Sequence, residues 1–406
     1  MKELPKDIDK LPKEITLDIF SRFTLKFLCQ IRSVCKSWCS LIDDIGLAIL
    51  VTELAQHGEE PMPLMVKHIP EDPCKLWFLL TFKSTYLGVT YLKMTKDPVY
   101  EFKRDIWSKG YNLNLVEGSC NGLIYSIKDR EDRYHGTTTF VVMDLSRKRS
   151  YMVPHINFPS GLMLSSGLGF DSWTGTFKMV CVFYNKPVVS LASPLSIDLI
   201  TENLVTMVHV LGTDSWRTIS NVMSYPTKGE GVFAHGCIHW LFACLDLHQL
   251  FEGKDGRNKV VCFNVAQEEF ALIDLPRQTI EGERVDHLVD LLGEVGLVFD
   301  NVGESVMEVW VLKQKKLWVI HCRFSKSEPL KNGIIRVIGY WNKDRDILLT
   351  ININTKKRLF VYCLKSRVVC EEIKFEHCKY GRKTEIRMYQ RSLFSIPSNK
   401  NLIQMI

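Results

Sequence analysis

Metal binding is the first chemistry to consider, because His235 and His239 lie four residues apart and thirteen cysteines are spread along the chain. Zinc sites use such side chains, with cysteine ligands often paired as Cys-x-x-Cys. No such pair occurs here, and the segment around both histidines is predicted to be a strand. Four residues of strand span about 13 Å, too far for one ion to bind both rings. We therefore predict no metal and no cofactor.

Catalytic motifs are also missing from the sequence. It contains no Gly-x-Ser-x-Gly elbow, no phosphate-binding loop ending in Lys-Ser or Lys-Thr, and no His-Glu-x-x-His. Asp144, Asp171 and Asp214 fall in predicted turns, where short acidic side chains favour turn formation. An active site would therefore have to be assembled from residues of distant loops.

Composition and charge further limit the class of protein to which the chain can belong. The 406 residues are 46% hydrophobic, enough for a large core, and no stretch reaches 18 uncharged apolar residues. Charges alternate over residues 1–10, which argues against a signal peptide, and the scattered cysteines are typical of reduced thiols. We expect a soluble protein of the cytoplasm, the nucleus or both, with no membrane partner.

Basic residues exceed acidic ones by 52 to 46, and the excess is spread out. Three clusters, at 147–149, 313–316 and 356–358, stand beside predicted turns. We interpret them as solvated turn residues and do not predict nucleic-acid binding, although a basic patch for an acidic partner is the alternative.

Residues 11–42 have the apolar spacing of three short helices. Pro12 suits a first helical position, and Thr24 can cap a second helix. A third stripe is predicted from Ile31 to Ile42 and ends at Asp43. Without further information these helices could be a cap packed on the rest of the chain, but they carry more apolar positions than one small unit can bury. That surplus predicts a partner.

Beyond residue 60, short apolar runs bounded by Gly, Asn, Asp and Pro predict strands. Similar units begin near residues 119, 167, 231, 287 and 334, about 45 to 65 residues apart. This spacing predicts a radial β-propeller, in which neighbouring blades cover each other's apolar faces. A β-sandwich or barrel is the alternative. Gly-Gly pairs of the kelch type and repeated Trp-Asp pairs are missing, so the propeller is a divergent one.

The N-terminal residues resemble an F-box, the helical module that binds the Skp-type adaptor of cullin-RING ubiquitin ligases. The similarity lies in residues 11–15, 19–22 and 34–38, while Phe23-Thr24 replaces a common Leu-Pro. The resemblance implies twelve adaptor-binding residues: Leu11, Pro12, Ile15, Ile19, Phe20, Leu25, Leu28, Ile31, Val34, Cys35, Trp38 and Leu41. Trp38 is the preferred anchor, because a buried tryptophan often dominates an interface.

The later segments resemble the F-box-associated domain of plant F-box proteins. Residues 119–123, 167–180, 213–217, 231–241 and 307–312 carry this similarity. Gly122, Gly169 and Gly236 are predicted at tight backbone positions, and Trp216, Trp240 and Trp310 in blade cores.

The predicted fold class is therefore a multidomain α+β protein, with a small all-α F-box followed by a mostly antiparallel all-β domain. Its predicted parts are an F-box at 1–45 with its core at 11–42, a connecting helix and first strands at 46–105, the propeller at 106–385, and a tail at 386–406.

The resemblance implies a substrate-recognition subunit of a Skp-cullin-F-box ubiquitin ligase, whose β domain holds an unidentified target protein. It also implies that the chain is not an enzyme and performs no bond chemistry itself. Loops at 186–202 and 248–259 are candidates for target contact. Several alternatives stay open. The closest one is a chain that acts outside a cullin ligase. The β domain could also be an enzyme, a propeller adaptor that binds a glycan or another small ligand, or a module that binds a nucleic acid.

Overall fold

The computed structural model describes residues 11–55, 61–68, 75–86, 89–95, 97–103, 115–130, 137–157, 162–185, 203–219, 225, 227–242, 259–276, 283–301, 305–313, 316–326, 330, 333–353, 356–375, 384–396 and 402–404. Four helices come first: α1 (Lys13–Ser21), α2 (Leu25–Ile31), α3 (Lys36–Ile42) and α4 (Ile45–Ala55). No helix in these ranges is both long and apolar enough to cross a membrane.

The described strands form six blades, which we number in chain order. Blade 1 contains β1 (Met62–His68), β2 (Lys75–Tyr86), β3 (Val89–Met94), β4 (Tyr100–Lys103) and β26 (Thr384–Tyr389). Blade 2 contains β5 (Gly118–Cys120), β6 (Leu123–Arg130), β7 (Thr137–Asp144), β8 (Arg149–Met152), β9 (Ile156–Asn157) and β27 (Leu402–Gln404). Blade 3 contains β10 (Leu162–Asp171), β11 (Thr176–Tyr184), β12 (Leu204–Val210) and β13 (Arg217–Ile219).

Blade 4 contains β14 (Thr227–Ala234), β15 (Cys237–Phe242), β16 (Lys259–Asn264) and β17 (Glu269–Asp274). Blade 5 contains β18 (Glu283–Asp290), β19 (Val295–Asn301), β20 (Val306–Lys313) and β21 (Leu317–Ser325). Blade 6 contains β22 (Ile334–Tyr340), β23 (Ile347–Ile353), β24 (Lys356–Cys363) and β25 (Val368–Phe375). A short parallel pairing of β25 with β3 joins blades 6 and 1 into one sheet.

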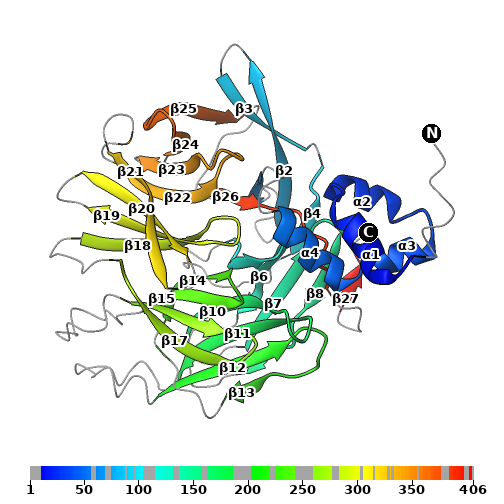
Figure 1. Cartoon of the computed structure of the whole chain (residues 1–406). Helices are drawn as coiled ribbons and strands as arrows, with labels where there is room; N and C mark the ends of the chain where they lie inside the picture. Colours follow the sequence, from blue (N-terminus) through cyan, green and yellow to red (C-terminus); the bar gives the residue numbers. More distant parts are fainter. Residues whose placement is uncertain are drawn as a thin grey trace.

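The blades are arranged around a common axis, as Figure 1 shows, with β5, β10, β14, β18, β22 and β26 as the inner strands of the six blades. The five predicted unit starts fall in or beside β5, β10, β14, β18 and β22, and the predicted antiparallel propeller after a helical module is confirmed. Sequence periodicity missed blade 1. Its inner strand β26 comes from the other end of the chain and pairs with β1 from Met62 opposite Tyr389 to Lys67 opposite Thr384.

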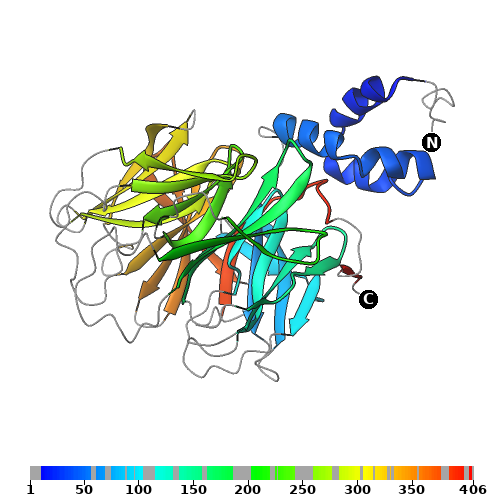
Figure 2. The same ribbon diagram turned by 90° about the horizontal axis from the view of Figure 1, so that it is seen from below.

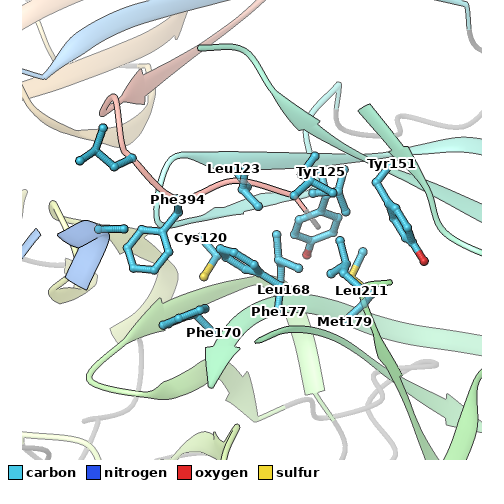
Figure 3. Packing of buried hydrophobic residues seen from close by; sticks show 14 of the residues in the cluster. Cys120, Leu123, Tyr125, Tyr151, Leu168, Phe170, Phe177, Met179, Leu211 and Phe394 are labelled. Carbon is cyan, nitrogen blue, oxygen red and sulfur yellow. The ribbon is translucent and has the colours of Figure 1, made fainter. Parts of the chain in front are cut away.

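The C-terminal residues thus belong to the propeller. Residues from 386 onward, set apart in the sequence-based division as a tail, include most of β26 and also β27, which pairs with β8. Between these strands, Phe394 packs against Phe170 and Phe177 at ring-centroid distances of 4.6 and 5.8 Å. Figure 3 shows this ring beside the facing residues of blades 2 and 3.

A separate apolar cluster fills each of the six contacts between neighbouring blades. Trp240 is fully buried in the cluster between blades 3 and 4, as predicted. Trp216 and Trp310 are partly buried and pack against neighbouring clusters. Because each blade face is covered only by the next blade, closure of the ring is a condition for burying the core.

Two aspartates that the sequence places in turns form hydrogen bonds that stabilise those turns. Asp171 accepts hydrogen bonds from the backbone N–H groups of Trp173 (2.9 Å) and Thr174 (3.3 Å), and Asp144 accepts one from Arg147 N–H (3.0 Å). Gly122 has φ of +80°, and a Cβ there would lie 2.4 Å from Cβ of Ser392. Only glycine fits this close approach of the β5–β6 turn to the C-terminal segment.

Candidate functional site

The helical module starts close to the predicted positions. α1 begins at Lys13, and Pro12 is its N-cap and not its first helical residue, because the Pro12 carbonyl accepts the Thr16 N–H at 3.1 Å. Thr24 caps α2 as predicted, with its hydroxyl accepting the Phe27 N–H at 3.3 Å. The hydroxyl of Thr24 thus supplies the helix start that a Leu-Pro would otherwise give.

The predicted third stripe was wrong as a single helix. Ile31 ends α2, and α3 begins only at Lys36. Cys35 is the N-cap of α3 and its sulfur accepts the Trp38 N–H at 3.4 Å. The spacing of apolar residues continued across a turn that contains Val34, so the sequence pattern joined two helices into one.

The twelve predicted adaptor-binding residues separate into three groups by exposure. Buried residues are Phe20, Leu25, Leu28, Ile31 and Trp38. Partly buried residues are Ile19 and Leu41, which pack on the same core. Exposed residues are Leu11, Pro12, Ile15, Val34 and Cys35. Some of the twelve predicted residues thus form the internal core of the helical module, and others lie on its outer surface.

Trp38 belongs to the internal group. Its side chain is 7% exposed and its ring meets Phe20 edge-on at a centroid distance of 5.5 Å. A partner could cover little more of it. The structure describes twelve large hydrophobic residues that are exposed, and half of them belong to the helical module. These six are Leu11, Ile15, Phe23, Val34, Ile45 and Leu50.

A partly buried arginine connects the helices to the propeller, and sequence analysis missed it. Arg147, in the β7–β8 turn, donates to the carbonyl oxygens of Leu393 (2.7 Å) and Phe394 (2.9 Å). Its Nη2 also lies 3.5 Å from a carboxylate oxygen of Asp43 at the end of α3. The interpretation of this residue as a solvated turn residue was wrong, because its side chain is 12% exposed.

Asp43, at the end of α3, is the residue of the helical module in this contact. Arg32 binds it through two hydrogen bonds, at 2.8 and 2.6 Å. Burial works against its charge, but the ion pairs with Arg32 and Arg147 outweigh burial and lower its pKa. Figure 2 shows the helices on one side of the propeller, and the apolar cluster of blades 2 and 3 continues into α1 to α4. The two parts therefore form a packed joint.

The second candidate site is a cavity of about 420 Å³ along the propeller axis. Glu230 of β14 lines this cavity and forms ion pairs with Arg387 of β26 and with Arg336 of β22 (2.9 Å). Burial opposes its ionisation, but the two guanidinium groups outweigh burial and hold its pKa at about 2. Arg387 also pairs with Glu385 and donates to the Val116 carbonyl at 2.9 Å.

The two histidines considered as metal ligands and the two candidate target-binding loops lie in different parts of the chain. His235 stands in the β14–β15 turn and His239 is buried in β15, where its Nδ1 lies 3.3 Å from the Val232 carbonyl. The described residues include no group of three or more metal-binding side chains. The loop at 186–202 and all of 248–259 except Lys259 lie outside the described residues.

Comparison with known proteins agrees with this architecture. Residues 88–392 match the F-box associated beta propeller domain, and residues 8–47 match the F-box-like family. F-box protein CPR1 of Arabidopsis thaliana is 24% identical over 375 residues, 85% of this chain and 80% of CPR1. F-box protein At4g19940 of the same plant is 24% identical over 323 residues, 77% of this chain and 71% of that protein.

Solved structures give only a weak likeness. The periplasmic gluconolactonase PpgL of Pseudomonas aeruginosa covers 84% of this chain and 100% of its own at 11% identity and a TM-score of 0.35, which supports no argument about function.

A helical module packed on one side of a closed ring of blades defines a two-part propeller protein. The chain belongs to the F-box associated β-propeller family and is a plant-type F-box protein, as its sequence motifs predict. Its F-box and propeller together support a role in substrate recognition.

Proposed function

We propose that this chain is the substrate-recognition subunit of a Skp-cullin-F-box ubiquitin ligase, acting in the cytoplasm or nucleus. The outer surface of α1 and the α2–α3 turn binds the Skp-type adaptor. The observation that carries this proposal is the exposure of Ile15 (48%) and Val34 (64%) within the F-box match, since burial of exposed apolar side chains by a partner is favourable.

The propeller holds the target and performs no chemistry. Because the helices are packed onto the propeller through Arg147 and Asp43, a target bound to the blades is kept at a fixed distance from the ligase. Ubiquitin transfer then gains from effective concentration and orientation.

Adaptor binding by full-length variants tests the proposal. Ile15→Asp and Val34→Asp place a charge on the outer surface, and we expect each to weaken binding of a purified Skp-type adaptor at least tenfold. Leu317→Asp is the control, because Leu317 is similarly exposed (57%) but lies on β21 of the propeller. Unchanged unfolding midpoints would show that the variants fold.

Two results would contradict the proposal: no adaptor binding by the unaltered chain, or equal binding by all three variants. Recruitment of a cullin distinguishes this proposal from its closest alternative. If the adaptor complex fails to recruit a cullin, the chain acts outside a cullin ligase.

A further inference from the structure

Three polar side chains with hydrogen-bond donors converge on one face of blade 6 at the axial cavity. In the antiparallel register Arg336 is opposite Thr350, Ile334 is opposite Asn352, and Asn352 is opposite Lys357. Paired residues, and residues two apart on one strand, share a face of a sheet. Arg336, Asn352 and Lys357 therefore lie on the same face, and all three line the cavity.

These residues lie at the end of the cavity away from the helices. The β10–β11 turn, at the C-terminal end of inner strand β10, approaches α4, where a Cβ on Gly175 would lie 3.7 Å from Ile45. Arg336 and Glu385, by contrast, lie near the N-terminal starts of inner strands β22 and β26. Because the inner strands of neighbouring blades run in the same direction, these starts lie at the opposite end of the cavity, which we call the distal mouth.

The two acidic groups at this mouth are engaged by Arg387. It pairs with both Glu230 and Glu385, and Arg336 shares Glu230 through one nitrogen. Arg336 keeps 43% of its side chain exposed, and Lys357 donates to the Thr384 carbonyl at 2.9 Å. The described side chains that line this mouth thus carry three positive and two negative charges, an excess of one positive charge. Glu117, near Val116, is not among the lining residues.

We propose that this mouth binds a single carboxylate group through Arg336, Lys357 and Asn352. One excess charge matches a monoanion, and a guanidinium, an ammonium and an amide N–H₂ together supply donors for both carboxylate oxygens. The carboxylate comes either from a small organic acid or from the C-terminal end of a polypeptide that enters the cavity. The site does not depend on adaptor binding, so each proposal can fail without the other.

Binding assays on the full-length chain test the site with two kinds of probe. The first is a monocarboxylate, acetate or benzoate in separate titrations, compared with chloride at equal ionic strength and followed by calorimetry. The second is a random hexapeptide pool with free C-terminal carboxylates, compared with the same pool carrying C-terminal amides. Binding of the acids alone identifies a small-acid site, and retention of the free but not the amidated peptides identifies a chain-end site.

Arg336→Gln and Lys357→Gln should each weaken the observed binding at least tenfold and leave adaptor binding unchanged. The matched control is Arg358→Gln, which removes a charge from the next residue of β24. Arg358 faces the other side of the sheet and pairs with Glu372 at 2.7 Å, so binding should persist. No binding of either probe, or an equal loss in the Arg358 variant, would overturn the carboxylate site.

Discussion

Trp38 shows, at the scale of one residue, that a motif position can serve the fold of the module. Its ring is 7% exposed and packs on Phe20, so we expect Trp38→Ala to lower the free energy of unfolding of the helical module by about 3–5 kcal/mol. Urea unfolding followed by circular dichroism at 222 nm measures this loss. Val34→Ala, at an exposed position, should change stability by less than about 0.5 kcal/mol. A mild effect at Trp38 would mean that its ring is not part of the core.

His239 makes the stability of the propeller depend on pH. Burial, together with the nearby charge of His235, lowers its pKa from 6.5 to about 4. Between pH 6.5 and 4 the unfolded chain therefore binds more protons at this residue, and stability falls as pH falls through that window. His239→Asn keeps a donor toward the Val232 carbonyl but cannot titrate.

We expect the unaltered chain to lose about 3 kcal/mol more stability than His239→Asn between pH 7 and pH 4. Urea unfolding at each pH measures the difference, and His209 and His321, whose pKa values burial also lowers, are present in both proteins. Parallel pH profiles would show that His239 is protonated without cost in the folded chain.

At the scale of elements, the β7–β8 turn holds α3 and the C-terminal segment together through Arg147. Arg147→Gln removes charge-assisted bonds to Asp43, Leu393 and Phe394. We expect amide exchange in α3 to become about 30-fold faster, since such bonds contribute about 2 kcal/mol. Hydrogen–deuterium exchange measures it, with Lys148→Gln as control, because Lys148 is the next residue and is exposed. Equal protection in both variants would argue against a joint at Arg147.

Local patterns predicted most elements, and contacts between distant segments explain the rest. Period-two runs and turn residues located five blades, because the strands of each of these blades are consecutive in sequence, apart from the short β27 at the outer edge of blade 2. The break at Cys35 was missed because apolar spacing continued through it, and Arg147 because its partners Leu393 and Phe394 are nearly 250 residues away. The cavity residues Arg336 and Lys357 gave no motif, since only strand register brings them to one face.

At the scale of the whole molecule, the helices and the proposed carboxylate site lie at opposite mouths of the propeller. A target bound at the distal mouth would leave the helices free for an adaptor, so both partners can bind one chain together. The blades between them must then act as one body, which requires the ring to be closed.

Closure depends on β26, because this strand fills the inner edge of blade 1 and covers apolar residues of its neighbours. A chain that stops after Phe375 would lack β26 and leave the inner edge of β1 and the faces around Met65 and Leu348 uncovered. We expect it to show no cooperative unfolding transition, since each blade is stable only between two others.

A chain that stops after Ile396 removes β27 but keeps β26, Phe394 and the partners of Arg147. β27 pairs with only three residues of β8 at the outer edge of blade 2, so this truncation should lower stability by at most about 2 kcal/mol and preserve a single transition. Calorimetry of both truncated chains compares them directly. If the shorter chain also unfolds cooperatively, the propeller does not need its C-terminal strand, and the ring is held by the contacts between blades alone.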